Sequence, residues 1–142
     1  MIVNTAYIYM GSGGGGEPAN PNLWQDGVSN YPVTFTKYCS ISSKGVLLSE
    51  SGSATFSELQ LTGYNSLTIS RVTGSFAAQN NIKIEFFNSA DQLLGTETAT
   101  FKTDMQSKTV NIPGSAKIQN AKIRMTNTSK IAPVTLSSAL LS

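Results

Sequence analysis

The fold is decided by two stretches, Ile82-Lys83-Ile84-Glu85-Phe86-Phe87 and Ala121-Lys122-Ile123-Arg124-Met125-Thr126. In the first stretch the apolar residues 82, 84 and 86 fall on one side of an extended chain, with Lys83 and Glu85 on the other. The second stretch repeats this period of two. Such alternation is typical of antiparallel strands whose sheet has one buried face and one face in water.

Shorter segments of the same kind fill the rest of the chain. Alternation at 33–41 predicts one strand with Val33, Phe35, Cys39 and Ile41 facing inward. In the segment 134–141, Val134, Leu136 and Leu140 are expected to face inward and Leu141 outward. Further strands are expected at 45–48, 59–61, 67–69, 93–101 and 108–112.

Turn residues separate these segments, as in Thr62-Gly63-Tyr64-Asn65 and Asn88-Ser89-Ala90-Asp91. No stretch has the three-and-four apolar spacing of a helix, so helix content is expected to be close to nil. The alternation slips between Phe56 and Leu59, and Arg71 takes an inward position, which we interpret as a bulge or a strand end. The pattern predicts an all-β protein, an antiparallel β-sandwich of the jelly-roll type.

The amino-acid composition excludes several classes of functional site. The chain has 142 residues, of which 39% are hydrophobic and 13% are charged, while Ser and Thr together supply 34. It has no histidine and one cysteine, which excludes a disulfide framework, a Cys/His zinc site and imidazole chemistry. The formal charge of +2 is spread along the chain and argues against nucleic-acid binding. We predict no cofactor, no metal, no membrane segment and no signal peptide.

The chain divides into an N-terminal arm at 1–10, a Gly/Pro-rich linker at 11–22 and a β-sandwich body at 23–142. A glycine run cannot pack, so 11–16 is expected to act as a flexible tether. An extended arm would have two apolar faces, which suggests that it pairs with another subunit. The alternative is an arm that folds back as an edge strand of its own sandwich. The predicted partner-binding residues are Ile2, Val3, Ala6, Tyr7, Ile8, Tyr9 and Met10.

Aromatic residues near turns are candidates for sugar binding. A ring can stack on the apolar face of a sugar, whose hydroxyls need amide, carboxylate or guanidinium partners. The candidates are Trp24, Tyr31, Tyr38, Tyr64, Asn65 and Arg71. The alternative is structural and is preferred for any single residue: Trp24 would close one end of the sandwich, and the tyrosines would bury their rings.

Paired carboxylates could hydrolyse glycosidic bonds without histidine. The internal candidates are Glu58, Glu85, Glu97 and Asp104. The pattern places Glu85 and Glu97 on the solvated face of neighbouring strands, where carboxylates are expected in any case. Asn88–Asp91 has too few carboxylates for a calcium cage and is better explained as a hairpin turn.

Residues 61–69, 82–95, 112–113 and 121–125, in this order, resemble galactose-binding-like jelly rolls, which occur in carbohydrate-binding modules and in virion proteins of tailed phages. The arm Ala6-Tyr7-Ile8-Tyr9-Met10 followed by a glycine run resembles anchoring segments of phage structural proteins. The resemblance implies a non-enzymatic virion component. The calcium-site residues of many such modules are not evident in this sequence.

From the residues and the resemblance we expect a phage virion accessory protein, either a head decoration or fibre subunit or a tail-tip component. It would be made in the host cytoplasm and act in the virion. Its arm would dock on other virion proteins, and copies of the protein would form a homo-oligomer that displays the body for weak, multivalent contacts with cell-surface glycans. The alternatives are a carbohydrate-binding module or lectin-like adhesin and, third, a small carboxylate glycosidase.

Overall fold

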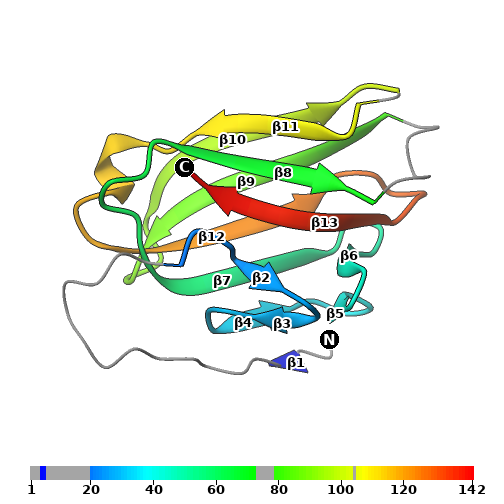
Figure 1. Cartoon of the computed structure of the whole chain (residues 1–142), viewed down its shortest axis with the longest axis horizontal. Coiled ribbons are helices and arrows are strands. Elements are labelled where there is room, and N and C mark those ends of the chain that lie inside the picture. The colour runs from blue at the N-terminus through cyan, green and yellow to red at the C-terminus, as the bar shows by residue number, and fades with distance from the viewer. Residues whose placement is uncertain (1–3, 6–19, 73–78, 104) are drawn as a thin grey trace.

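Two antiparallel sheets face each other in a β-sandwich of the jelly-roll type (Figure 1). The computed structural model of the chain describes residues 4–5, 20–72, 79–103 and 105–142. Sheet A has the strand order β1 (Asn4–Thr5), β4 (Val33–Phe35), β7 (Ser53–Gln60), β12 (Asn120–Asn127), β9 (Asn80–Asn88) and β10 (Leu93–Phe101). Sheet B has the order β11 (Ser107–Asn111), β8 (Ser66–Arg71), β13 (Val134–Leu141), β6 (Gly45–Leu48) and β5 (Ser40–Ser42).

A short hairpin of β2 (Trp24–Gln25) and β3 (Val28–Ser29) accompanies the two sheets, and one 3-10 turn covers Gly114–Ala116. Among the residues that the structure describes, none forms a helix with the length and hydropathy needed to cross a bilayer. The predicted all-β sandwich is confirmed.

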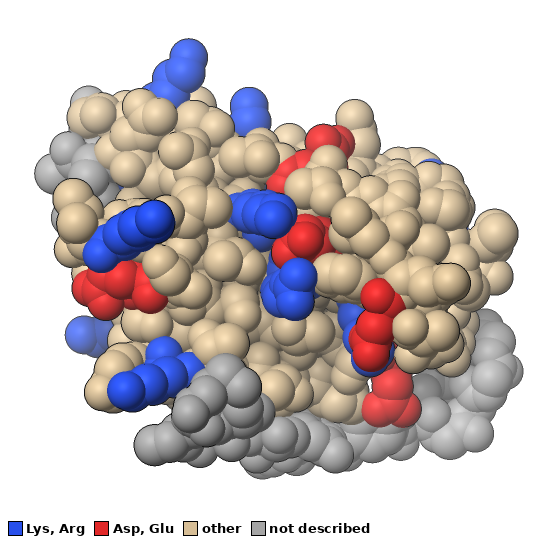
Figure 2. Space-filling view, turned by 180° about the vertical axis from the view of Figure 1, so that it is seen from behind, with Lys and Arg blue, Asp and Glu red and all other residues tan. Residues whose placement is uncertain are grey.

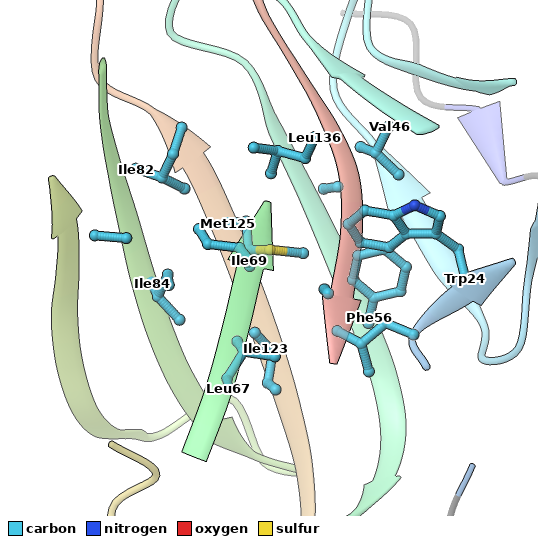
Figure 3. Close-up of a cluster of buried hydrophobic side chains, with 14 of the residues drawn as sticks. Trp24, Val46, Phe56, Leu67, Ile69, Ile82, Ile84, Ile123, Met125 and Leu136 are labelled. Atoms are coloured by element: carbon cyan, nitrogen blue, oxygen red, sulfur yellow. The ribbon is translucent and has the colours of Figure 1, made fainter. Parts of the chain in front are cut away.

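The core lies between the sheets, where the inward faces of the alternating strands meet. Ile84 and Met125 from sheet A are completely buried and face Leu67 and Ile69 from sheet B (Figure 3). Trp24 of the hairpin closes one side of this core, and its ring stacks on Phe56 with 5.6 Å between centroids. The side chains that the alternation predicted to face inward therefore do pack against each other in the core.

The strand predicted at 33–41 is divided between the two sheets. β4 belongs to sheet A and β5 to sheet B, and Tyr38 in the connection has a φ of 66°. A residue in this left-handed region turns the chain sharply, so the strand cannot continue. Ile41 is only half-buried, whereas Val33, Phe35 and Cys39 are buried as expected.

The prediction for Leu140 and Leu141 is wrong. Leu141 is buried, whereas Leu140 is 40% exposed. The register of β13 against β8 shifts between Leu136 and Ser138, and the extra residue of this bulge reverses the faces of the residues that follow it. The slip predicted between Phe56 and Leu59 is confirmed, because the register against β12 also shifts there and Glu58 has a φ of 58°.

The N-terminal residues that the structure describes, Asn4 and Thr5, form β1 at the edge of sheet A and pair with β4. Asn4 stands opposite Phe35 and Thr5 opposite Thr34. This is the fold-back arrangement named above as the alternative for the arm. The predicted partner-binding residues all lie outside the described residues: Ile2, Val3, Ala6, Tyr7, Ile8, Tyr9 and Met10.

Residues at the end of the predicted linker belong to sheet B. Asn22 forms a bridge with Leu140, and the Leu141 amide donates to the Pro21 carbonyl at 2.7 Å. The tyrosine hydroxyl of Tyr31 donates to the Asn20 carbonyl at 2.7 Å. The described contacts with sheet B therefore include residues 21–22, slightly before the predicted body.

Asn127 at the end of β12 is completely buried and holds three segments together. Its side-chain amide donates to the carbonyls of Leu48, Ser49 and Ala132, at 3.3, 3.2 and 2.8 Å. A buried amide that donates to carbonyls of three residues has a structural role, because it ties their segments together; the Ser49 carbonyl also accepts the Gly52 amide at 2.8 Å.

Candidate ligand-binding groove

A groove of about 460 Å³ crosses the outer face of sheet A. Residues directly opposite one another in neighbouring strands share a face of the sheet. Thr34 stands opposite Thr55, Thr55 opposite Arg124, and Arg124 opposite Glu85, so one row of outward side chains runs across β4, β7, β12 and β9. The groove is lined by Thr34, Thr55, Ser57, Phe87, Asp91, Lys122 and Arg124.

Charged side chains of both signs gather on this side of the molecule, as Figure 2 shows. The strongest pair joins β12 to β9: the Arg124 guanidinium donates to Glu85 Oε1 from Nε at 3.0 Å and from Nη2 at 2.8 Å. The Glu85 side chain is only 10% exposed, and Lys83 Nζ lies 3.5 Å from its other oxygen. These contacts fix the guanidinium in the floor of the groove.

A second pair lies at the hairpin between β9 and β10. Lys122 Nζ donates to Asp91 Oδ1 at 2.7 Å, and the Asp91 side chain is 76% exposed. The hairpin is shaped by Asn88, whose Oδ1 accepts the Ala90 and Gln92 amides at 2.9 and 3.0 Å. The turn predicted at 88–91 is therefore confirmed, and it places a carboxylate at the rim of the groove.

One aromatic ring joins the charged and hydroxyl groups. Phe87 is half-buried, and the Arg124 guanidinium lies over its ring at 4.8 Å from the centroid. Such a cation–π contact holds both groups in place. Phe87 thus contributes an apolar surface to a groove that is otherwise polar.

Several hydrogen-bonding groups of the groove have no partner among the residues that the structure describes. The hydroxyls of Thr34 and Thr55 make no hydrogen bond with any residue that the structure describes. Arg124 Nη1 is likewise without a partner in the described chain, since only Nε and Nη2 reach Glu85. The groove can therefore offer donors and acceptors to a ligand without breaking internal hydrogen bonds.

None of the six residues predicted to bind a sugar lines the groove. Trp24 is 3% exposed and donates from its indole N–H to the Ser137 carbonyl at 3.2 Å. Tyr31 is 7% exposed. Because both rings are buried, neither offers a ring face on which a sugar could stack, and the expectation that they bind a ligand is corrected. The structure agrees with the alternative, in which these rings are part of the core.

Arg71 is also a structural residue. It ends β8 and is completely buried, with its guanidinium 5.0 Å from the centroid of the Phe101 ring. Nη1 donates to Asn80 Oδ1 at 2.8 Å, Nη2 to the Lys102 carbonyl at 3.0 Å and Nε to the Met105 carbonyl at 3.0 Å. Burial on this scale removes Arg71 from the candidates for surface binding, and the strand end that the pattern predicted is confirmed.

The remaining three candidates lie on connections between strands. Tyr38 is 73% exposed beside Lys37, whose Nζ lies 4.8 Å from the ring centroid. Tyr64 is half-buried against the core, and Asn65 accepts a hydrogen bond from Lys117 Nζ at 2.7 Å. These residues stay predictions for sugar binding, apart from the groove.

The structure separates the carboxylates proposed for glycoside hydrolysis. Glu85 stands opposite Thr96 and faces outward, whereas Glu97 stands opposite the buried Ile84 and so takes the inward face of the edge strand β10. The prediction that Glu85 and Glu97 share the solvated face is therefore wrong. Glu58 occupies the bulge of β7, and Asp104 lies outside the described residues.

No local sequence signal marks the groove residues as a site. Lys122, Arg124 and Phe87 occupy the outward positions of the two stretches that decide the fold. Their joint position depends on the pairing of β12 with β9, which alternation alone does not give.

The fold and groove define a β-sandwich protein with an open polar groove across one sheet. No model of a known family matches this sequence, and no curated protein sequence matches it either. Among solved structures the chain is similar to CBM35 from Cellvibrio japonicus Abf62, with a TM-score of 0.45 and 14% identity. This match covers 76% of the present chain and 75% of the other.

Proposed function

We propose that the protein is a non-catalytic binding module that holds a neutral carbohydrate in the groove of sheet A. The proposal rests on one observation: free Thr hydroxyls, a fixed guanidinium with unused donors and a half-buried phenyl ring line the same groove. Sugar recognition needs this combination, because the hydroxyls of a sugar both donate and accept while its C–H face is apolar.

The charges favour a neutral ligand. Each cation in the groove has an anion beside it, since Arg124 is paired with Glu85 and Lys122 with Asp91. An anionic ligand would compete with these carboxylates, whereas a pair of neighbouring sugar hydroxyls can donate to Asp91 and accept from Lys122.

The contacts available are few, so a single groove is expected to bind weakly. The groove is open, so its charged rim is hydrated before a ligand binds. A ligand replaces hydrogen bonds that these groups already make with water, and the net gain in binding free energy is small. Useful affinity would come from several copies acting together on a repeating polysaccharide.

The test is a glycan array with the protein presented on a multivalent support, followed by titration calorimetry with the best neutral oligosaccharide. Thr55→Val removes a groove hydroxyl at nearly constant volume. Thr126→Val is the matched control, because Thr126 lies on the outer face of the same strand as Arg124 and does not line the groove. We expect Thr55→Val to weaken binding by about 3- to 10-fold, the cost of one lost hydrogen bond, and Thr126→Val to leave it unchanged.

A second pair of variants tests the charged groups. Lys122→Ala should weaken binding, whereas Lys44→Ala, at the exposed turn between β5 and β6, should not. Binding that is lost in neither groove variant would refute this site, and loss in Tyr38→Ala or Tyr64→Ala would move it to those connections.

The virion role is a separate proposal that rests on the resemblance of the sequence. It requires an arm that other virion proteins can reach, whereas Asn4 and Thr5 pair with β4 of their own sheet. Deleting residues 1–16 tests it: a truncated protein that still joins purified particles with unchanged occupancy would refute docking through the arm.

A further inference from the structure

The edge of sheet A at β4 is where this chain holds its own N-terminal residues. β4 pairs with β7 on one side, where Val33 stands opposite Phe56 and Phe35 opposite Ala54. On its other side β4 would present unpaired amides and carbonyls, and β1 occupies that side through Asn4 and Thr5. An open edge of this kind readily pairs with any suitable extended segment.

We propose that this edge also accepts residues 4–5 from a second copy of the chain, so that two copies exchange their N-terminal strands. The proposal does not depend on carbohydrate binding. In such an exchange the ladder contacts are the same in both arrangements, because an identical segment fills an identical edge. What differs is only the copy that supplies the strand.

The connection and the length of the pairing favour exchange. Residues 6–23 join β1 to β2, and they contain the glycine run predicted above to be a tether. A short flexible tether gives the arm an effective concentration of about 1 mM at the edge of its own sheet. The arms of other copies therefore compete with it when the protein itself is at a similar concentration. Among the described residues, Asn4 and Thr5 pair with β4, and the ladder bonds of these two residues must open before exchange.

Exchange would place the strand of one copy beside the groove of the other. Thr5 stands opposite Thr34, and Thr34 lines the groove on the outer face of sheet A. Two grooves would thus be joined in one particle, the arrangement that a weak site for a repeating ligand needs.

The register supplies a direct test by disulfide trapping in a Cys39→Ala background, which removes the cysteine of the native chain. Residues opposite each other in an antiparallel pair have Cβ atoms about 4.5–5.5 Å apart, close to disulfide geometry. A Thr5→Cys chain is mixed with a Thr34→Cys chain, so a disulfide between positions 5 and 34 can form only between copies. The control mixture replaces the second chain with Thr126→Cys, which lies on the same sheet face two strands beyond β4.

After oxidation at about 1 mM chain, we expect the 5–34 dimer to exceed the 5–126 dimer at least about tenfold, because pairing raises the local concentration of one cysteine at the other. At about 10 µM the excess should disappear, while a Thr5→Cys/Thr34→Cys double variant forms its internal disulfide. Equal yields from both mixtures at high concentration would overturn strand exchange. A double variant that forms no internal disulfide would overturn the β1–β4 pairing on which exchange is built.

Discussion

Replacing Arg71 with methionine should destabilise the protein more than any surface change. The side chain is completely buried at the end of β8, and its guanidinium donates to Asn80 Oδ1 and to the carbonyls of Lys102 and Met105. Methionine keeps the length and apolar stem of the arginine but has no donor. Arg71→Met therefore removes the hydrogen bonds while largely retaining the packing.

The magnitude follows from the acceptors left without a donor. A hydrogen bond from a charged donor is worth about 1.5–3 kcal/mol, and two acceptors, Asn80 Oδ1 and the Met105 carbonyl, lose the guanidinium as their donor, whereas the Lys102 carbonyl keeps the Met105 amide at 3.0 Å. We expect a loss of about 3–5 kcal/mol in the free energy of unfolding, the sum of these two lost hydrogen bonds. In a chain of this size each kcal/mol lowers Tm by about 2–4 °C, so Tm should fall by about 10 °C or more.

Urea titration followed by Trp24 fluorescence measures this loss, because that indole is 3% exposed and leaves its stack on Phe56 when the chain unfolds. With a slope of about 2 kcal/mol/M, the midpoint should fall by about 2 M at unchanged slope. The matched control is Lys122→Met, which removes a cation from a surface pair and should cost less than about 1 kcal/mol. Equal midpoints for the two variants would refute the role given to Arg71.

Three further variants test other parts of the fold by the same titration. Gly45→Ala should cost about 3 kcal/mol or more, because φ is +123° and the new Cβ would lie 2.0 Å from the Leu136 carbonyl oxygen. The control Gly63→Ala also has a positive φ but meets open space, so it should cost about 1–2 kcal/mol. Equal costs for the two variants would contradict the close approach at Gly45. Phe56→Ala should cost about 3–5 kcal/mol and shift the fluorescence of the folded state, and an unchanged spectrum would argue against the stacked indole. Asn127→Ala should cost about 2–4 kcal/mol by removing the buried donor shared by the Leu48, Ser49 and Ala132 carbonyls, of which Ser49 keeps the Gly52 amide, and a loss below about 1 kcal/mol would contradict this structural role.

The sequence predicts the sandwich well because alternation directly reports burial. Ile82, Ile84 and Ile123 are buried as their positions require. Alternation fails where one residue is inserted: the bulge before Ser138 reverses Leu140 and Leu141, and no local signal in 134–141 marks it. Pairing and register are set by the whole fold, so they are not available from one strand alone.

The candidate site was harder to predict than the fold. Aromatic residues near turns suggested Trp24 and Tyr31, but large rings near strand ends are more often needed to close a core. The groove residues Arg124 and Phe87 look in the sequence like ordinary solvated positions. They become a site only because β12 pairs with β9 in the register that puts Arg124 opposite Glu85.

The buried amide of Asn127 has a practical consequence for producing the protein. Asn127-Thr128-Ser129 is a triplet that secretory cells glycosylate, and they do so on chains that have not finished folding. A sugar attached there would occupy the nitrogen that Leu48, Ser49 and Ala132 need, and it would have no room in the closed sandwich. Expression in a bacterial cytosol avoids this modification, whereas a secreting eukaryotic line should yield material that is retained or misfolded.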